Sequence, residues 1–207
     1  APLIISASRS TDIPAFYSKW LFNRLKEGYA KWINPFNRRP QYISFKKARV
    51  IVFWTKNAKP IMNRLKELDE MNIDYYFQYT LNDYEKEGLE GNIPKLEDRI
   101  ETFKKLSNML GKERVIWRFD PLILTENLGI EELLAKIKKV GDEIHNYTEK
   151  LVFSFADIST YLKVQRNLKR SGVKYIEFQA DDMVEVAKGL RDINRDWGLD
   201  LATCCEE

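Results

Sequence analysis

Short apolar runs and longer amphipathic segments alternate along the whole chain. The apolar runs are rich in β-branched and aromatic residues, and they read LIIS (3–6), RVIVFWT (49–55), DYYFQYTL (74–81), RVIWRF (114–119), KLVFSF (150–155) and LDLATC (199–204). Runs of this composition and length are typical of buried strands. A further run, VKYIEF (173–178), comes before the last one, and we expect it to be irregular.

Segments with helical periodicity separate these strands. Helices are predicted over 13–28, 58–71, 95–110, 130–145, 159–171 and 181–197. Strands that alternate with helices of this length predict parallel βαβ units. About six units fall short of the eight of a full barrel. The predicted fold class is therefore α/β: a parallel (β/α) barrel-like fold, related to the TIM barrel, which is open or incomplete. A flat doubly wound sheet is the alternative.

One segment fits neither a long helix nor a barrel strand. WINPFNRRPQYISF (32–45) contains Asn-Pro and Arg-Pro steps, which mark turns. We expect an inserted loop or small hairpin there, within a single barrel-like domain over residues 1–207. The last predicted strand is followed directly by the chain's final residues, with no helix to cover it. We therefore expect the domain to lack a C-terminal segment.

Composition and charge narrow the function classes. The chain has 207 residues, with 34 basic and 31 acidic side chains and a net charge of +3. This balance is too mild to argue by itself for nucleic-acid or membrane binding. The longest apolar run, VIVFW (50–54), is far shorter than the roughly 20 residues of a membrane helix, so no membrane association is expected.

Cysteine and histidine usage adds two expectations. The two cysteines are adjacent, Cys204 and Cys205, so they provide no disulfide framework, and a reducing, cytoplasmic setting is expected. The single histidine, His145, excludes multi-histidine metal sites and argues against a Ser–His–Asp arrangement. No metal ligands are assigned on this basis.

Active sites of α/β proteins lie at the carboxyl ends of the strands. Side chains suited to ligand binding gather at the predicted strand ends: Ser6, Ser8, Arg9, Trp54, Lys56, Asn57, Gln78, Thr80, Asn82, Arg118, Asp120, Ser154 and Cys204. A purely structural barrel core would carry Val, Ile and Leu in these layers. Buried polar groups without partners cost about 1–3 kcal/mol each. A ligand site is the favoured interpretation, and an internal polar network is the alternative.

Three of these residues are candidates for chemistry. Arg118 and Asp120 share a strand face in WRFDP (117–121), where Arg118 would bind a carboxylate or phosphate, and Asp120 would orient it or accept a ligand hydroxyl. A salt bridge at the barrel rim is the competing interpretation. Lys56 follows a strand, but a surface lysine is the simpler interpretation. Arg9 precedes a helix and would suit an anion site, whereas Thr11 or Asp12 would cap that helix.

A basic stretch with interleaved aromatic residues covers 38–49, RRPQYISFKKAR. It would suit nucleic acid, although a solvated loop is the simpler interpretation. A small-molecule ligand, anionic because of the two arginines, is the partner expected first. No glycine-rich phosphate loop of the GxGxxG or GxxxxGKT kind is present.

Several stretches together resemble a known family. They follow one another in the order ISASRSTDIPAFY, NPFN, IVFWTKN, YYFQYTLN, LEDRIETF, RVIWRFDP, LVFSFADI and TCCEE. In this order they are similar to the bacterial and archaeal family called domain of unknown function 1848, over essentially the whole chain. The resemblance implies a TIM-barrel-like fold. It also implies a C-terminal cysteine cluster similar to that of radical S-adenosylmethionine enzymes, and hence a 4Fe–4S cluster and S-adenosylmethionine as cofactors.

The sequence departs from that pattern because the downstream cysteines are absent. A 4Fe–4S cluster needs three or four thiolates, and only Cys204 matches the family's strand-end cysteine. The leading hypothesis is the barrel part of a radical-S-adenosylmethionine-like, iron–sulfur enzyme of unknown substrate. A second is a non-catalytic binding module for a small anionic ligand or nucleic acid. A third is a metal-free barrel hydrolase or lyase using Asp120 and Lys56.

Overall fold

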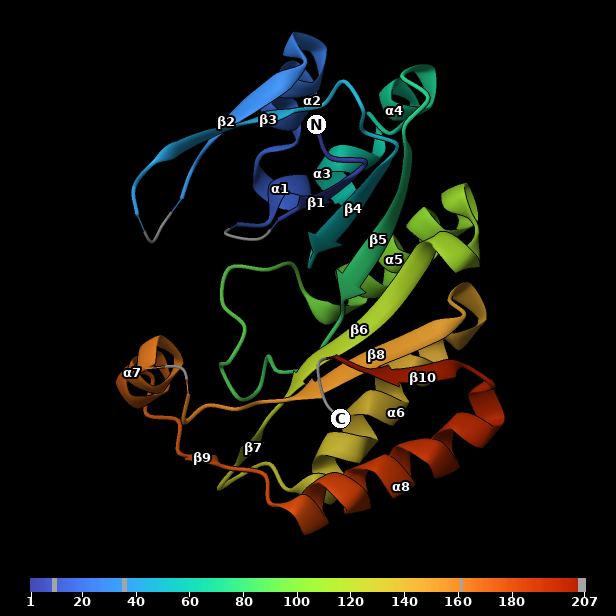
Figure 1. Ribbon diagram of the computed structural model, residues 1–207. Coiled ribbons are helices and arrows are strands. Elements are labelled where there is room, and N and C mark those ends of the chain that lie inside the picture. Colours follow the sequence, from blue (N-terminus) through green and yellow to red (C-terminus); the bar gives the residue numbers. More distant parts are fainter. Residues whose placement is uncertain (9–10, 35–36, 161, 205–207) are drawn as a thin grey trace. The chain divides into compact units, whose positions relative to one another are not determined.

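The computed structural model shows a mixed α/β protein and describes residues 1–8, 11–34, 37–160 and 162–204 (Figure 1). Six strands form one sheet in the order β1-β4-β5-β6-β8-β10, so the order in the sheet follows the order in the chain. The pairings β1–β4, β4–β5, β6–β8 and β8–β10 are parallel. This is the arrangement of successive β/α units, and it confirms the predicted fold class.

The six strands coincide closely with the predicted ones. Their bounds are β1 Ile4–Ala7, β4 Val50–Thr55, β5 Asp74–Thr80, β6 Val115–Leu122, β8 Lys150–Phe155 and β10 Asp200–Thr203. The run over 173–178 contributes only the two-residue strand β9 (Tyr175–Ile176), which pairs antiparallel with β7 (Leu124–Thr125) outside the main sheet. This run is therefore largely irregular, as expected.

The chain divides into two compact units, residues 1–79 and 80–207. The first unit contains β1, β4 and β5, together with four helices and a hairpin. The helices are α1 Ile13–Phe16, α2 Ser18–Glu27, α3 Lys59–Met62 and α4 Lys66–Glu70. Phe53 and Phe77 stack in its core with ring centroids 4.9 Å apart, and both are fully buried.

Two long helices predicted in this unit are each divided. The helix expected over 13–28 breaks at Tyr17, and the helix expected over 58–71 is interrupted by turns at 63–65. Gly28 ends α2 in the left-handed conformation, with φ of 80°. The hairpin predicted near 32–45 is present and begins earlier, directly after this glycine, as β2 (Tyr29–Ile33) and β3 (Pro40–Ser44) in antiparallel pairing.

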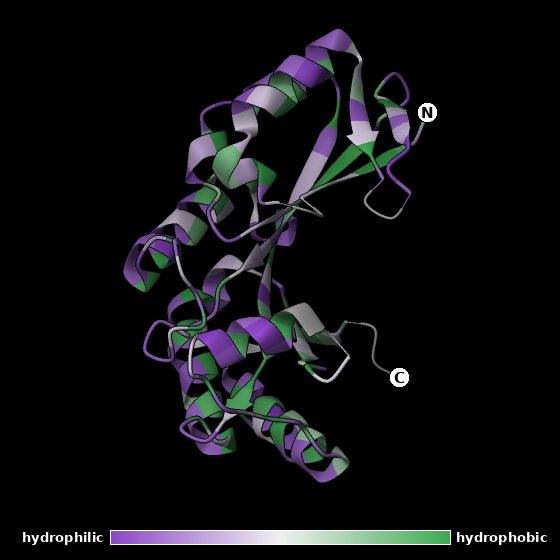
Figure 2. Ribbon diagram, turned by 90° about the vertical axis from the view of Figure 1, so that its left-hand side faces the viewer, coloured by the Kyte–Doolittle hydropathy of each residue, from purple (hydrophilic) through white to green (hydrophobic). Residues whose placement is uncertain are grey.

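The second unit contains β6, β8 and β10 together with four long helices. The helices are α5 Leu96–Leu110, α6 Ile130–Ile144, α7 Leu162–Arg170 and α8 Ala180–Trp197, with short 3-10 turns at Lys112–Arg114 and His145–Tyr147. Helix α5 contacts β6, and α6 contacts both α5 and α8. Both hydrophobic and hydrophilic residues occur along the helices of the protein (Figure 2). The core contains Trp117, Phe119, Ile137 and Val186, all fully buried. None of the helices in the described residues is long and apolar enough to cross a membrane.

Candidate functional site

Arg118, Asp120 and Ser154 meet at the carboxyl ends of β6 and β8. Arg118 donates from Nε and Nη2 to Asp120 Oδ2, at 3.0 and 2.5 Å. Ser154 Oγ donates to the other carboxylate oxygen, Oδ1. Arg118 is buried, with only 3% of its surface exposed. The arginine is therefore engaged by Asp120, as the salt-bridge interpretation anticipated, and the carboxylate is held in one orientation from both sides.

Asn82 fixes the backbone of the same strand end. Its Oδ1 accepts from the Asp120 amide at 3.0 Å, and its Nδ2 donates to the Asp120 carbonyl at 3.2 Å. Asn82 is 1% exposed. This paired contact satisfies both halves of the side-chain amide. A residue expected to contact ligand thus serves to position Asp120.

Two further residues support this strand end, and sequence reasoning missed both. Tyr84 Oη donates to the Pro121 carbonyl at 3.0 Å and accepts from the Ile123 amide at 3.2 Å. Burial raises the pKa of the Tyr84 hydroxyl well above its ordinary value of 10. The phenol therefore stays protonated and acts as a fixed hydrogen-bonding group.

Arg99 is the second missed residue. It lies on α5, its side chain is fully buried, and it donates to the carbonyls of Pro94 and Asn82 at 3.0 and 3.1 Å. It also pairs with Glu85 and Glu90 at 3.4 and 3.5 Å. The signal in the sequence was an arginine on the apolar face of LEDRIETF, which sequence reasoning did not weigh. Arg99 holds the loop that carries Asn82 and Tyr84.

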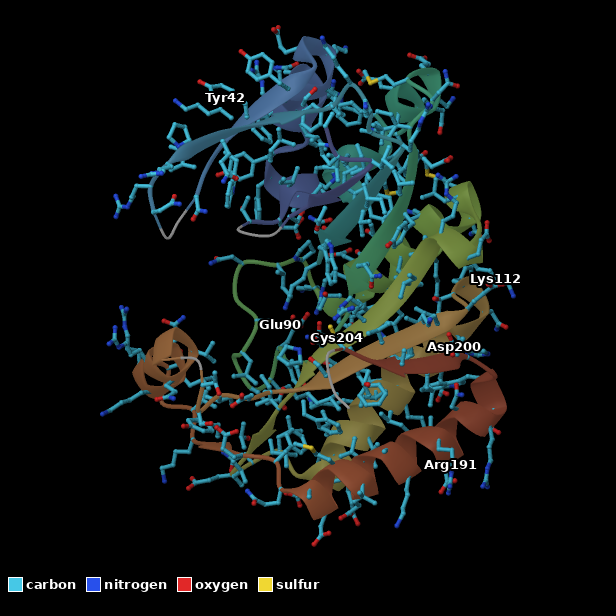
Figure 3. All side chains as sticks on the ribbon, in the orientation of Figure 1. Tyr42, Glu90, Lys112, Arg191, Asp200 and Cys204 are labelled. Carbon is cyan, nitrogen blue, oxygen red and sulfur yellow. The ribbon has the colours of Figure 1, made fainter. Side chains whose placement is uncertain are left out.

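A cavity of ≈ 1160 Å³ opens beside Asp120 at the carboxyl ends of β6, β8 and β10. Its polar lining residues are Asp120, Ser154, Asp157, Ser159, Glu177, Thr203 and Cys204. Its apolar lining comes mainly from Phe155, Ile158, Val164, Phe178, Met183 and Val184. Figure 3 shows Cys204 at the end of β10. The volume would accommodate a drug-sized small molecule, and the lining offers both apolar and polar contacts.

The charge of this cavity is negative. Three carboxylates line it, and no lysine or arginine does so among the described residues. Glu177 Oε1 is buried without a hydrogen-bond partner in the described part of the chain. Asp157 accepts from Thr160 Oγ1 at 2.5 Å and from Ser159 Oγ at 3.0 Å. These hydrogen bonds, with that of Thr160 the strongest, lower the pKa of Asp157 below its ordinary 3.8.

A second polar cluster lies in the first unit, after β1. Asp12 caps α1 by accepting from the Ala15 amide at 3.0 Å. It also accepts from Thr55 Oγ1 at 2.8 Å and from the Lys56 amide at 2.8 Å. Ser8 Oγ accepts from the Ile13 amide at 2.9 Å. The polar residues after β1 therefore cap a helix and tie it to the end of β4.

The remaining predicted site residues that are described in the first unit lie on β1, β4 and β5 or directly after β4. Trp54 and Gln78 are register partners on β4 and β5, and both are half-buried. Asn57 donates from its amide to Thr55 Oγ1 at 2.9 Å and accepts from the Lys59 amide at 3.1 Å. Ser6 is exposed on β1. Arg9 lies outside the described residues.

The structure thus brings Asn82, Arg118, Asp120 and Ser154 together within residues 80–207, and Cys204 lines the adjoining cavity. Thr80, half-buried at the end of β5, is in the same unit. Ser6, Ser8, Trp54, Lys56, Asn57 and Gln78 belong to residues 1–79.

The described residues do not fit an iron–sulfur cluster. A 4Fe–4S cluster needs three or four thiolates, whereas Cys204 is the single cysteine within the described part of the chain. No group of three His, Cys, Asp or Glu side chains among the described residues is placed to hold a metal ion. The residues described here would therefore not ligate the cluster that the family resemblance implies.

The fold is similar to that of a known lyase. Spore photoproduct lyase, solved as a single-residue mutant, matches with a TM-score of 0.55 and 12% sequence identity. The match covers 97% of this chain and 60% of the lyase, so the chain spans about three fifths of that protein's length. At this identity the likeness concerns the fold alone.

Two other comparisons add less. A candidate alpha-L-fucosidase from Bacteroides thetaiotaomicron matches 97% of this chain and 86% of its own at 10% identity, but its TM-score of 0.29 carries no argument. A search of curated proteins found no match.

The family model described as a domain of unknown function (DUF1848) matches residues 4–207, so the chain belongs to that family.

Proposed function

We propose that this chain is the barrel part of a radical-S-adenosylmethionine-like, iron–sulfur enzyme, and that the cavity beside Asp120 holds the substrate. The observation that carries the proposal is the cavity itself, of ≈ 1160 Å³, at the carboxyl ends of parallel strands. The fold shared with a lyase supports an enzyme of barrel type. The radical chemistry rests on the family resemblance.

The residues of this chain would bind and orient the substrate. Asp120 presents a carboxylate that Arg118 and Ser154 hold in place, so a substrate group would meet it in a preorganised orientation. The apolar lining would exclude water from the other side of the substrate. A bound cluster and S-adenosylmethionine would supply the radical chemistry. The described residues do not provide the cluster's ligands, and no step is assigned through it.

The charge of the cavity leads us to propose a substrate with a positively charged group. An anionic ligand was expected from Arg9 and Arg118, but Asp120 engages the guanidinium of Arg118. The same pairing offsets the charge of Asp120, and the further carboxylates of Asp157 and Glu177 would instead attract an amine or another organic cation.

Iron content tests the enzyme proposal. The longest open reading frame containing this chain would be purified and reconstituted without oxygen, and its iron and acid-labile sulfide measured. We expect about four irons per chain. An Asp120→Asn variant should retain the same iron, because Asp120 is assigned to the substrate. A reconstituted protein without iron and sulfide would refute the proposal.

A non-catalytic binding module is the second candidate. It is favoured by the single cysteine among the described residues. It would use the same cavity and would bind its ligand with no iron present, so the iron measurement separates the two candidates.

A further inference from the structure

The β2–β3 hairpin and the turn after it form a basic, aromatic surface. Residues 28–49 contain six lysines and arginines and no aspartate or glutamate. The whole chain has a net charge of only +3. Positive charge is therefore concentrated in this segment, while the rest of the chain is slightly acidic. This distribution of charge favours binding of a negatively charged partner.

The register of the hairpin gathers aromatic rings on one face. Tyr29, Lys31 and Ile33 alternate along β2, and Lys31 lies opposite Tyr42 on β3. The rings of Tyr29 and Tyr42 are 5.9 Å apart. Tyr29 is 44% exposed and Tyr42 is 67% exposed, and Figure 3 labels Tyr42 on this hairpin. Two exposed, neighbouring rings offer a platform for stacking.

The opposite face of the hairpin is structural. Ala30 is buried, and Trp32 and Ile43, which share that face, are half-buried. The hairpin is thus anchored through one face and leaves the tyrosine face to solvent.

The cations of residues 28–49 are available to a partner. Lys31, Arg38, Arg39, Lys46, Lys47 and Arg49 are all exposed. None of them forms an ion pair with an acidic residue of the described chain. Guanidinium and ammonium groups without acidic partners suit phosphate oxygens, and their binding to phosphates releases counterions.

We propose that the β2–β3 hairpin binds single-stranded nucleic acid. Bases would stack on Tyr29 and Tyr42, while Lys31, Arg38 and Arg39 would contact the backbone phosphates. Stacking on exposed rings requires bases that are free of a duplex, so a single strand fits this surface better than a double strand. The proposal goes beyond the proposed function and does not rest on it, because the hairpin belongs to residues 1–79 and the cavity to residues 80–207.

Fluorescence anisotropy with a labelled oligonucleotide of about 20 nucleotides tests this surface. The probe would be used as single-stranded DNA, single-stranded RNA and duplex DNA of one mixed sequence, at several salt concentrations. We expect a single strand to bind more tightly than the duplex. A Tyr29→Ser/Tyr42→Ser variant should bind about 10-fold more weakly. Tyr29→Phe/Tyr42→Phe keeps the rings and should bind like the wild type.

Charge variants test the phosphate contacts separately. Lys31→Gln/Arg39→Gln should reduce the salt dependence of log Kd by about 1.4, because each lost phosphate contact removes about 0.7. Lys105→Gln/Lys188→Gln removes the same charge from exposed positions on α5 and α8 and should change little. Circular dichroism checks that each variant folds.

Four results would overturn the proposal: no saturable binding at low salt, tighter binding of the duplex, unchanged binding by the Tyr→Ser variant, or equal weakening by the control pair. Tighter binding to vesicles of phosphatidylserine and phosphatidylcholine than to the oligonucleotides would assign the surface to a membrane instead.

Discussion

Asp12 shows how one side chain joins the loop after β1 to the end of β4. It caps α1 and accepts from Thr55 and from the Lys56 amide. Burial raises the pKa of Asp12 above its ordinary 3.8, although the hydrogen bonds from the Lys56 and Ala15 amides and from Thr55 oppose this shift. The residue therefore stabilises the unit through hydrogen bonds and pays a desolvation cost for its charge.

Replacement of Asp12 tests this role. Asp12→Ala removes a helix cap and the partner of Thr55, so we expect the free energy of unfolding to fall by about 2 kcal/mol near neutral pH. Urea unfolding measures the loss. Asp69→Ala, at an exposed position on α4, should change stability by less than about 0.5 kcal/mol and serves as the matched control.

The pH dependence of the same variant has a defined sign. A raised folded-state pKa means that the folded protein binds more protons than the unfolded chain above about pH 3.8. The stability contributed by this proton is complete below the unfolded pKa and is lost as the pH rises through the folded pKa. Asp12→Ala should therefore cost more at about pH 4 than at about pH 7.5. A cost that grows toward neutral pH would contradict this assignment.

Gly141 on α6 packs so closely against Trp197 that no larger residue fits at position 141 without a shift. A Cβ on Gly141 would lie 2.2 Å from both Cη2 and Cζ2 of Trp197. That indole is itself held, since it lies 5.8 Å from the Trp117 ring and donates to Asp142 Oδ1 at 3.0 Å. Gly141→Ala should lower the free energy of unfolding by about 2 kcal/mol despite the better helix propensity of alanine.

Gly189 on α8 provides the matched comparison. A Cβ there would meet Leu134 Cδ1 at 2.4 Å, but this atom is the end of a flexible side chain, and Leu134 is only half-buried. Gly189→Ala should leave stability unchanged or raise it by up to about 1 kcal/mol. Thermal unfolding of both variants measures the difference. Equal losses would mean that Trp197 does not fix the approach of the two helices.

The elements that sequence reasoning predicted well are those whose pattern is local. Strands such as 150–155 and helices such as 130–144 follow from composition and periodicity alone. The break at Tyr17 was missed because the apolar spacing continues through it. Arg118 and Asp120 share a face by strand alternation, so their pairing was foreseeable. The contact of Asp120 with Asn82 requires the spatial placement of a loop, which no local pattern encodes.

Glu177 is a cavity residue that could not be assigned to the site from the sequence. It lies in an irregular segment after β9, where no periodicity assigns its side chain to a face. The cavity and its negative lining arise from three separate chain segments, around Asp120, Asp157 and Glu177. The sign of the ligand's charge can therefore be inferred only from the folded structure.

At the scale of the whole molecule, the cavity's charge predicts which ligands it selects. Tryptamine, tryptophol and indole-3-propionate share an indole ring and differ in their positive, neutral or negative tail. Calorimetry should show tryptamine binding several-fold more tightly than tryptophol, and indole-3-propionate most weakly, because Asp157 and Glu177 add two carboxylates to a lining in which Arg118 offsets the charge of Asp120. The preference should decline with added salt.

One substitution and one control test whether the preference for a cationic ligand comes from the cavity lining. Glu177→Gln removes the buried carboxylate oxygen that has no described partner, so it should reduce the preference for tryptamine over tryptophol while sparing tryptophol binding. Glu185→Gln removes the same charge from an exposed position of α8 outside the cavity lining and should leave the preference intact. If indole-3-propionate bound most tightly, the anionic-ligand interpretation would replace the cationic one. Equal effects of the two variants would mean that selectivity comes from the overall charge of the unit, and the cavity would lose its assignment as the substrate site.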